Sequence, residues 1–229
     1  MSEDEPLVAE SRDVRDDALA WADDRLASLA RGRVLDVGCG EGRFLRDGWI
    51  GVDVERGPLR FARLRSPLVA VADAHRLPFR DGVFDTVLAF RMLNAADAID
   101  AALAELRRVL AGGGALLVLT IGGVRDTALG RVDATVRDRR GGDRLDETNG
   151  AERLRRFFPR VRQEQFARRF RFDDAAAALD HYARVYVHRG NPDASEILRR
   201  FETARDRIRR LPLPIDDERR ATLFVAELD

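Results

Sequence analysis

The stretch from Arg33 to Gly42, RVLDVGCGEG, decides the fold of this chain. Val34, Leu35 and Val37 are apolar and lie close to glycines, a pattern typical of a short strand buried on both faces of a parallel sheet. Glycine then recurs at every second position through residue 42, which removes side chains from a turn where the backbone can bend and approach a ligand. The stretch therefore predicts a strand followed by a glycine loop that binds a small molecule.

Two common nucleotide-binding loops do not fit this stretch. A dinucleotide fingerprint, G-x-G-x-x-G, would have its third glycine where the chain has Arg43. A phosphate-binding loop would end in Gly-Lys followed by Ser or Thr, and the chain contains no lysine. The glycine loop therefore indicates another class of ligand.

The composition favours a single domain. The chain has 229 residues, 45% of them hydrophobic, which is enough for one sizeable core. Its 40 basic and 40 acidic residues leave no net charge that would favour nucleic acid or an acidic membrane surface. The balance is uneven, however, because residues 131–171 contain thirteen arginines and seven acids.

The single cysteine and the amino terminus bear on the compartment. Cys39 excludes an internal disulfide and fits a reducing environment, where we expect it to fill a tight turn and not to act as a nucleophile. The first ten residues, MSEDEPLVAE, are acidic where a signal peptide would be basic. The longest weakly polar run, residues 109–124, is interrupted by the glycines at 112–114 and is too short to cross a bilayer. We therefore expect a cytoplasmic protein without a membrane segment.

Alternating strands and helices are predicted in the first half of the chain. Apolar residues at helical spacing predict a helix over residues 13–29. Further helices are expected to open at residues 43–46 and to cover residues 60–64 and 99–110, the last ended by the glycines at 112–114. Strands are expected at residues 49–54, 68–72, 84–90 and 115–121. This alternation indicates an α/β fold with a parallel sheet.

The second half predicts more helix. Helices are expected at residues 126–140, 149–157, 174–187 and 194–211, with Asp173 and Asp174 capping the third of them. Strands are expected at residues 161–166 and 222–228. The helices within residues 173–211 are thus interpreted as an insertion before the last strand.

Two motifs carry a resemblance to a known family. The heptapeptide from Asp36 to Gly42, DVGCGEG, resembles the first motif of class I methyltransferases that depend on S-adenosylmethionine. Asp73 to Phe79, DAHRLPF, resembles their second signature, and the helix and strand over residues 99–121 resemble a further part of the domain. On these features the chain is identified as a member of the methyltransferase type 11 family over roughly its first half.

The resemblance implies a Rossmann-like class I methyltransferase fold with a seven-stranded mixed sheet and an α-helical cap. In this fold the last strand is antiparallel and lies between the fifth and the sixth. Residues 1–229 would form one domain, with an N-terminal helical segment (1–32), a cofactor-binding core (33–121) and a substrate-side half (122–229). The helical insertion at about 173–211 would serve as a substrate lid.

The resemblance also implies S-adenosylmethionine as cofactor. Its methionine end would lie on the glycine loop, its ribose on an acid that ends the second strand, and its adenine on the segment after the third strand. In doubly wound sheets ligands lie at the carboxyl ends of strands, which places an acid there well for both ribose hydroxyls. The cofactor-binding residues so implied are Asp36, Gly38, Cys39, Gly40, Gly42 and Arg43 for the methionine end, Asp53 and Val54 for the ribose, Asp73 and Ala74 for the adenine, and Arg91 after the fourth strand.

The acceptor site is expected to combine three segments. Trp21 could stack on a ligand or could pack in the core, and the segment with Met92 and Asn94 lies where the family borders its substrate. A cluster of mainly aromatic and titratable residues from His181 to His188 would form a pocket wall, with helix packing as the alternative. Its members are His181, Tyr182, Val185, Tyr186 and His188. The two histidines lie seven residues apart without a further ligand between them, so no metal site is expected.

The expected reaction is methyl transfer to an oxygen, nitrogen or carbon nucleophile of a small molecule, mainly by proximity and orientation. Many family members have a histidine near the position of Asn94, and this chain does not, so the general base stays unknown, with His75 and His181 as weak candidates. One alternative is an RNA methyltransferase that uses the arginines of residues 131–171, and another is a non-catalytic relative that keeps the cofactor pocket.

Overall fold

The chain forms two compact units. The computed structural model describes residues 14–123, 126–136, 144–186 and 193–229. We name the units the sheet unit, residues 17–122, 143–166 and 221–229, and the helical unit, residues 1–16, 123–142 and 167–220. The prediction of a single domain over residues 1–229 stays a prediction.

The sheet has seven strands in the order β3-β2-β1-β4-β5-β7-β6. The neighbouring strands β3 and β2, β2 and β1, β1 and β4, and β4 and β5 each form a parallel pair. The bounds are β1 (Val34–Val37), β2 (Ile50–Asp53), β3 (Val69–Val71), β4 (Phe84–Phe90), β5 (Leu110–Gly123), β6 (Arg160–Phe172) and β7 (Ile215–Glu227). The predicted seven-stranded mixed sheet is confirmed.

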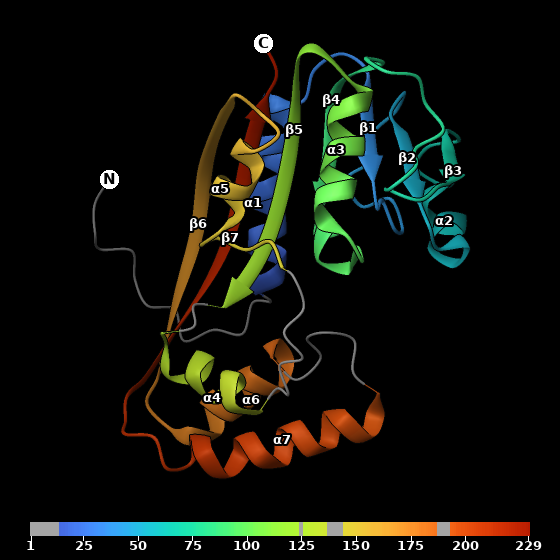
Figure 1. Cartoon of the computed structure of the whole chain (residues 1–229). Coiled ribbons are helices and arrows are strands. Elements are labelled where there is room, and N and C mark those ends of the chain that lie inside the picture. Colours follow the sequence, from blue (N-terminus) through green and yellow to red (C-terminus); the bar gives the residue numbers. More distant parts are fainter. Residues whose placement is uncertain (1–13, 124–125, 137–143, 187–192) are drawn as a thin grey trace. The chain divides into compact units, whose positions relative to one another are not determined.

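The last strand runs antiparallel between β5 and β6, as predicted. The Gly113 N–H donates to the Asp229 carbonyl, and the Leu228 N–H donates to the Gly114 carbonyl, so the end of β7 pairs with the beginning of β5. Figure 1 shows the opposite directions of these two strands. Both β6 and β7 continue along the chain into the helical unit and are longer than expected.

Helices cover both faces of the sheet unit. They are α1 (Val14–Leu29), α2 (Arg56–Ala62), the short 3-10 helix η1 (Leu93–Ala95), α3 (Ile99–Val109) and α5 (Gly150–Arg155). Successive side chains of β4 point to opposite faces of the sheet. Val87 and Ala89 pack with α3 on one face, while Leu88 and Phe90 pack with α1 on the other. Figure 1 shows α3 on one side of the sheet and α1 on the other. Each large apolar side chain buried in these layers contributes about 1.5 to 3 kcal/mol.

The helix expected to open at residues 43–46 is absent. Consecutive turns take its place, in which the Gly42 N–H donates to the Cys39 carbonyl at 2.8 Å and the Leu45 N–H donates to the Gly42 carbonyl at 3.1 Å. Gly42 and Gly48 both have a φ of 77°, which a right-handed helix cannot contain. The chain therefore returns to β2 without a helix.

The glycines at 112–114 do not end the preceding helix. Helix α3 ends at Val109, and Leu110 already has an extended backbone with ψ of 137°. The glycines lie within β5, where the register shifts because Phe84 pairs with Leu110 while Thr86 pairs with Ala115. They therefore form an irregularity of the strand, with Gly113 at a φ of 72°.

The helical unit contains α4 (Ala128–Val136), α6 (Ala175–Val185) and α7 (Ala194–Ile208). Helix α7 contacts both α4 and α6, as Figure 1 shows. The side chain of Asp174 accepts a hydrogen bond from the Ala177 N–H and caps α6 as predicted, and Asp193 caps α7 in the same way. Residues 137–140 of the helix expected at 126–140 lie outside the described residues.

A buried carboxylate lies in the core of the helical unit. The side chain of Asp217, on β7, is fully buried. Its oxygens accept hydrogen bonds from the Thr127 hydroxyl at 2.6 Å and the Tyr186 hydroxyl at 2.9 Å, and Nε2 of His181 lies 3.2 Å away. Because a buried charge is costly without such partners, this cluster fixes how α6 packs on β7.

The Asp217→Asn substitution is expected to destabilise the helical unit by about 1 to 3 kcal/mol, because an amide cannot accept from all the donors that the carboxylate serves. Both tyrosines of the chain lie in the helical unit and both tryptophans in the sheet unit, so the two aromatic signals report the units separately. Urea unfolding followed by tyrosine absorbance should shift to lower urea, while Asp206→Asn, on the exposed side of α7, should leave the midpoint unchanged. An unchanged tyrosine midpoint in Asp217→Asn would contradict the assigned role of this carboxylate.

Candidate functional site

The loop after β1 meets the segment after β4 at the carboxyl edge of the sheet. The N–H groups of Gly38 and Cys39 donate to the carbonyl of Val52 at 2.8 and 3.0 Å, which holds the loop on β2. Gly38 has a φ of 71°, and a Cβ added there would lie 2.4 Å from Cβ of Met92. Only glycine fits between these two segments.

The next glycine opens onto free space. Gly40 has a φ of 54°, and an added Cβ would meet nothing within 4 Å. Its N–H donates to Oδ2 of Asp53 at 2.8 Å, while the Glu55 N–H donates to Oδ1 at 2.9 Å. The carboxylate that ends β2 therefore lies beside the open part of the loop, as expected for a ribose-binding acid, and Val54 beyond it is exposed.

Asp36 is buried beneath this loop. Its residue is 2% exposed, and no residue that the structure describes donates a hydrogen bond to its carboxyl group. Burial first, and then the charge of Asp53, raise the pKa of Asp36 to about 7. Because the pKa is raised from 3.8 to about 7, the contribution of Asp36 to stability falls as the pH rises between these two values.

The thiol of Cys39 shares this environment. Burial, followed by the charges of Asp36 and Asp53, raises the pKa of Cys39 to about 12. The thiol therefore stays protonated at neutral pH, where a thiolate would be needed for nucleophilic attack. Cys39 fits the expected role of a small residue in a tight turn.

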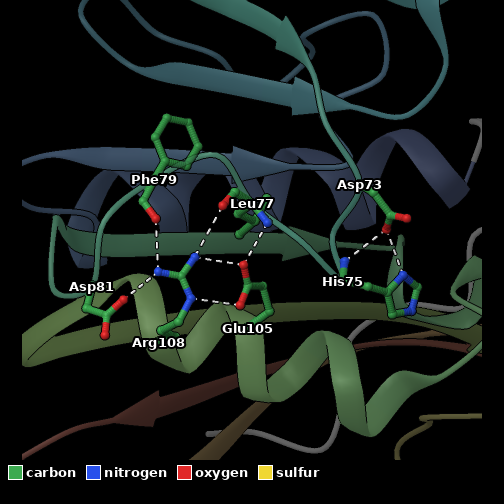
Figure 2. Close-up of polar contacts among 7 residues, drawn as sticks. All are labelled: Asp73, His75, Leu77, Phe79, Asp81, Glu105 and Arg108. Atoms are coloured by element: carbon green, nitrogen blue, oxygen red, sulfur yellow. Dashed lines mark hydrogen bonds and ion pairs between the residues drawn. The ribbon is translucent and has the colours of Figure 1, made fainter.

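The segment after β3 presents a carboxylate and a backbone N–H side by side. Oδ1 of Asp73 accepts from the His75 N–H at 2.9 Å and lies 2.7 Å from Nδ1 of the same residue, as Figure 2 shows. The backbone hydrogen bond from His75, and then its ring, lower the pKa of Asp73. The Ala74 N–H has no acceptor among the residues that the structure describes. A donor and an acceptor at this place suit the edge of a purine ring.

One arginine fixes this segment onto α3. Arg108 donates to both oxygens of Glu105, to the carbonyls of Leu77 and Phe79, and to Oδ1 of Asp81, over distances of 2.6 to 3.2 Å (Figure 2). Glu105 in turn accepts from the Leu77 N–H at 2.7 Å, and hydrogen bonds from Arg108 lower its pKa. The sequence showed only a Glu-x-x-Arg pair at helical spacing, and neither residue was among the expected site residues.

The segment after β4 carries two features that the sequence did not indicate. Arg91 has a φ of 63°, which is uncommon for a residue with a side chain, and its N–H donates to the Leu119 carbonyl at 2.9 Å. Asn94 forms a pair of hydrogen bonds with the backbone of Leu145, one from Nδ2 at 3.0 Å and one to Oδ1 at 2.8 Å. Asn94 therefore joins this segment to the chain before α5, and the substrate roles of Met92 and Asn94 stay predictions.

Trp21 packs within the sheet unit. Its ring is partly buried beside the apolar residues of α1 and stacks on Phe166, with centroids 5.9 Å apart. This contact is the packing alternative that the sequence analysis left open. Stacking of Trp21 on a ligand stays a prediction.

The expected pocket-wall residues of α6 lie in the core of the helical unit. Tyr182 and Tyr186 are fully buried and stack with centroids 5.1 Å apart. His181 is 5% exposed, contacts the rings of Phe170 and Phe172, and lies beside Asp217. Helix packing is thus what the structure shows for these three residues, and His188 lies outside the described residues.

Asp217 and Thr127 were missed by the sequence analysis, because they are 90 residues apart and share no motif. Within the described part of the chain, no group of three or more histidine, cysteine or acidic residues could hold a metal ion. No helix there is long and apolar enough to cross a membrane.

Comparisons with known proteins show what this chain is similar to. Residues 35–118 match the family model described as a methyltransferase domain, of type 11. A malonyl-[acyl-carrier protein] O-methyltransferase of Geobacter sulfurreducens is 42% identical over 95 residues, which cover 36% of this chain and 36% of that protein. The ubiquinone/menaquinone biosynthesis C-methyltransferase of Cupriavidus metallidurans is 34% identical over 139 residues, covering 49% of this chain and 56% of that protein.

A relative that acts on RNA matches as well. The tRNA (carboxymethyluridine(34)-5-O)-methyltransferase alkbh8 of Xenopus tropicalis is 37% identical over 103 residues, covering 42% of this chain and 16% of that protein. The chain thus spans less than two thirds of the length of each of these relatives.

The fold has solved counterparts. A S-adenosylmethionine-dependent methyltransferase of Thermotoga maritima, described as a possible histamine N-methyltransferase, superimposes with a TM-score of 0.58 at 18% identity, covering 93% of this chain and 89% of that chain. Residues 35–118 of the chain are thus similar to the type 11 methyltransferase domain, and the glycine loop and the fold agree with that match.

Proposed function

We propose that this chain binds S-adenosylmethionine at the carboxyl edge of its sheet and transfers the methyl group to an oxygen, nitrogen or carbon nucleophile of a small molecule. The observation that carries the proposal is the Asp53 carboxylate beside Gly40, where the loop is open and a Cβ would meet nothing. A ribose can take the place of backbone partners at such a carboxylate, because its two hydroxyls are donors.

The other residues of the site fit the remaining parts of the cofactor. The Ala74 N–H and the Asp73 carboxylate offer a donor and an acceptor for the adenine edge. Arg43 is exposed next to the loop and would bind the methionine carboxylate. The arginine network of Figure 2 would hold the adenine-binding segment in place before the cofactor arrives.

The proposed reaction requires little acid or base catalysis from the residues of the chain. The bound cofactor supplies a methyl group that is already electrophilic, so the residues chiefly have to hold the acceptor atom in line, and such positioning can be worth about 7 to 11 kcal/mol. His75 is paired with Asp73, and His181 is buried against Asp217, so we assign neither as a general base. Transfer by proximity and orientation is the mechanism proposed.

A small-molecule acceptor is favoured over RNA by the ion pairs of the arginine-rich segment. Among the described residues of 131–171, many of the arginines already contact carboxylates of the chain. The pairs are Arg153 and Arg156 with Asp100, Arg160 with Asp229, Arg162 with Glu164, Arg169 with Glu218 and Arg171 with Asp216. Arginines that are paired in this way are less available to bind phosphates.

Calorimetry should detect S-adenosylmethionine binding, and Asp53→Ala should weaken it by about a hundredfold, because the ribose loses a charged acceptor. The matched control is Asp47→Ala, an exposed carboxylate close in sequence, which should bind like the parent. Tryptophan fluorescence should confirm that the sheet unit stays folded in both variants. The proposed site would be refuted if the parent bound no cofactor or if Asp53→Ala bound it equally well.

Arg108 is not assigned to contact the cofactor, yet the Arg108→Met substitution should weaken cofactor binding by about tenfold or more. The reason is that the segment from Leu77 to Asp81 loses the donor that fixes it. The neighbouring Arg107→Met removes an exposed guanidinium from the same helix and should have no effect. Adenosine alone should show the same loss as the whole cofactor, since the segment is assigned to the adenine end. Equal affinities of the two variants would contradict the positioning role of Arg108.

Cell extract incubated with the protein and methyl-labelled cofactor should accumulate label in the small-molecule fraction. The Asp53→Ala variant serves as the control for transfer by other enzymes. Label that appears instead in the RNA fraction and disappears with salt would favour the RNA alternative. Binding of the cofactor without transfer to any fraction would favour a non-catalytic relative.

A further inference from the structure

The outer side of α2 and the turn that follows it form an exposed surface of mixed character. Leu59, Ala62 and Ser66 are fully buried and hold this segment on the sheet unit. The side chains between them are exposed arginines and large apolar residues, and Figure 1 shows α2 beside β3 at the edge of the sheet. We call this surface the α2 patch, and it consists of Arg60, Phe61, Arg63, Leu64, Arg65 and Leu68.

The apolar side chains of the α2 patch are open to solvent. Leu64 is 84% exposed, Leu68 47% and Phe61 44%. The Leu64 N–H donates to the Phe61 carbonyl at 3.0 Å, so the turn continues the winding of α2. Leu64 therefore projects away from the buried Leu59 and Ala62. Apolar side chains that gather on the surface in this way indicate an interaction site.

Hydrogen bonds keep this turn ordered without a partner. The N–H groups of Arg65 and Ser66 both donate to the Ala62 carbonyl, at 2.9 and 3.0 Å. The Ser66 hydroxyl donates to the Trp49 carbonyl at 3.0 Å and accepts from the Leu68 N–H at 3.2 Å. The α2 patch is thus preformed, so little backbone ordering opposes binding.

The arginines of the α2 patch carry an unbalanced positive charge. Residues 56–72 contain no acidic residue. Among the described residues, no acid forms an ion pair with Arg63 or Arg65, and the guanidinium of Arg60 lies over the Phe61 ring, 4.7 Å from its centroid. The chain as a whole has no net charge, but this surface favours an anionic partner.

An anionic bilayer fits both kinds of side chain better than other partners do. A second copy bound through the same surface would place arginines against arginines, because a two-fold interface joins identical patches. RNA would pair with the arginines but would leave Leu64 and Leu68 in water. An acidic protein would need a pocket for Leu64, whereas a fluid bilayer accepts apolar side chains at its acyl boundary and arginines at its phosphates.

We propose that the α2 patch binds the surface of a bilayer that contains anionic lipids. Its apolar side chains enter the acyl boundary, and its arginines contact the lipid phosphates. The patch lies beside the beginning of β3, whereas the candidate cofactor site lies where the parallel strands end. Membrane binding therefore leaves that site accessible, and the inference is independent of the proposed function.

Sedimentation of the whole chain with vesicles tests the proposal. The chain should bind vesicles made of equal amounts of phosphatidylcholine and phosphatidylglycerol about tenfold or more tightly than vesicles of phosphatidylcholine alone. Added salt should weaken this binding, because it screens the arginines. Equal binding to both kinds of vesicle, or binding to neither, would overturn the proposal.

Replacement of the three patch arginines by glutamine should weaken binding by about a hundredfold, since each basic residue at an anionic surface is worth about fivefold. The matched control replaces Arg107, Arg155 and Arg209, which are exposed elsewhere, and should bind nearly like the parent. Tryptophan fluorescence should confirm that the sheet unit stays folded in both variants. An equal loss in both would show a dependence on net charge alone and would overturn the proposal.

The apolar contribution needs its own variant. Leu64→Ser should weaken binding by about tenfold, while Leu198→Ser, on α7 and 63% exposed in the parent, should have no effect. Cys39 is buried, so a polarity-sensitive dye can be attached selectively to Leu64→Cys. Its emission should shift to shorter wavelength with anionic vesicles. An unchanged affinity of Leu64→Ser, or tighter binding to polyglutamate or RNA than to vesicles, would overturn the proposal.

Discussion

The hydrogen bond from the Gly40 N–H to Asp53 joins the two parts of the chain on which the candidate site depends. It forms because β1 and β2 are parallel neighbours in register, so that the loop after one strand lies beside the last residue of the other. Gly38 can approach Met92, and Gly40 can leave space above the loop, only because neither has a side chain. The order of the strands and these two glycines thus place a carboxylate next to an open backbone turn, and every assigned contact of the cofactor follows from that edge.

Much of this edge could be predicted from the sequence, because its signals are local. The seven residues of β4, the cap of α6 by Asp174 and the acid that ends β2 each depend on a short pattern of apolar, acidic or glycine residues. The helix expected at residues 43–46 was wrong because the left-handed glycines on either side of it outweigh the helical preference of the residues between them.

The residues that the sequence analysis missed are held by contacts between distant segments. Arg108 fixes a segment that lies about thirty residues earlier, Asn94 pairs with Leu145, and Asp217 gathers donors from two other segments of the helical unit. No local sequence pattern predicts such partners, because the sequence around a surface arginine or asparagine is the same whether or not its side chain has a distant partner. The aromatic cluster of α6 shows the converse case, where a pattern that suggested a pocket wall belongs to a packed core.

Two of the buried aspartates, Asp36 and Asp217, differ in their hydrogen-bond partners. Asp217 has hydroxyl and imidazole partners from its own unit, so its burial is satisfied and serves packing. Asp36 has none among the described residues, and its burial, followed by the charge of Asp53, raises its pKa to about 7. A crystal structure of the chain with S-adenosylhomocysteine tests the central claim most directly. The account predicts both ribose hydroxyls within hydrogen-bond distance of Asp53 and the adenine edge on the Ala74 N–H. A nucleoside bound elsewhere, with Asp53 still held only by the N–H groups of Gly40 and Glu55, would contradict it.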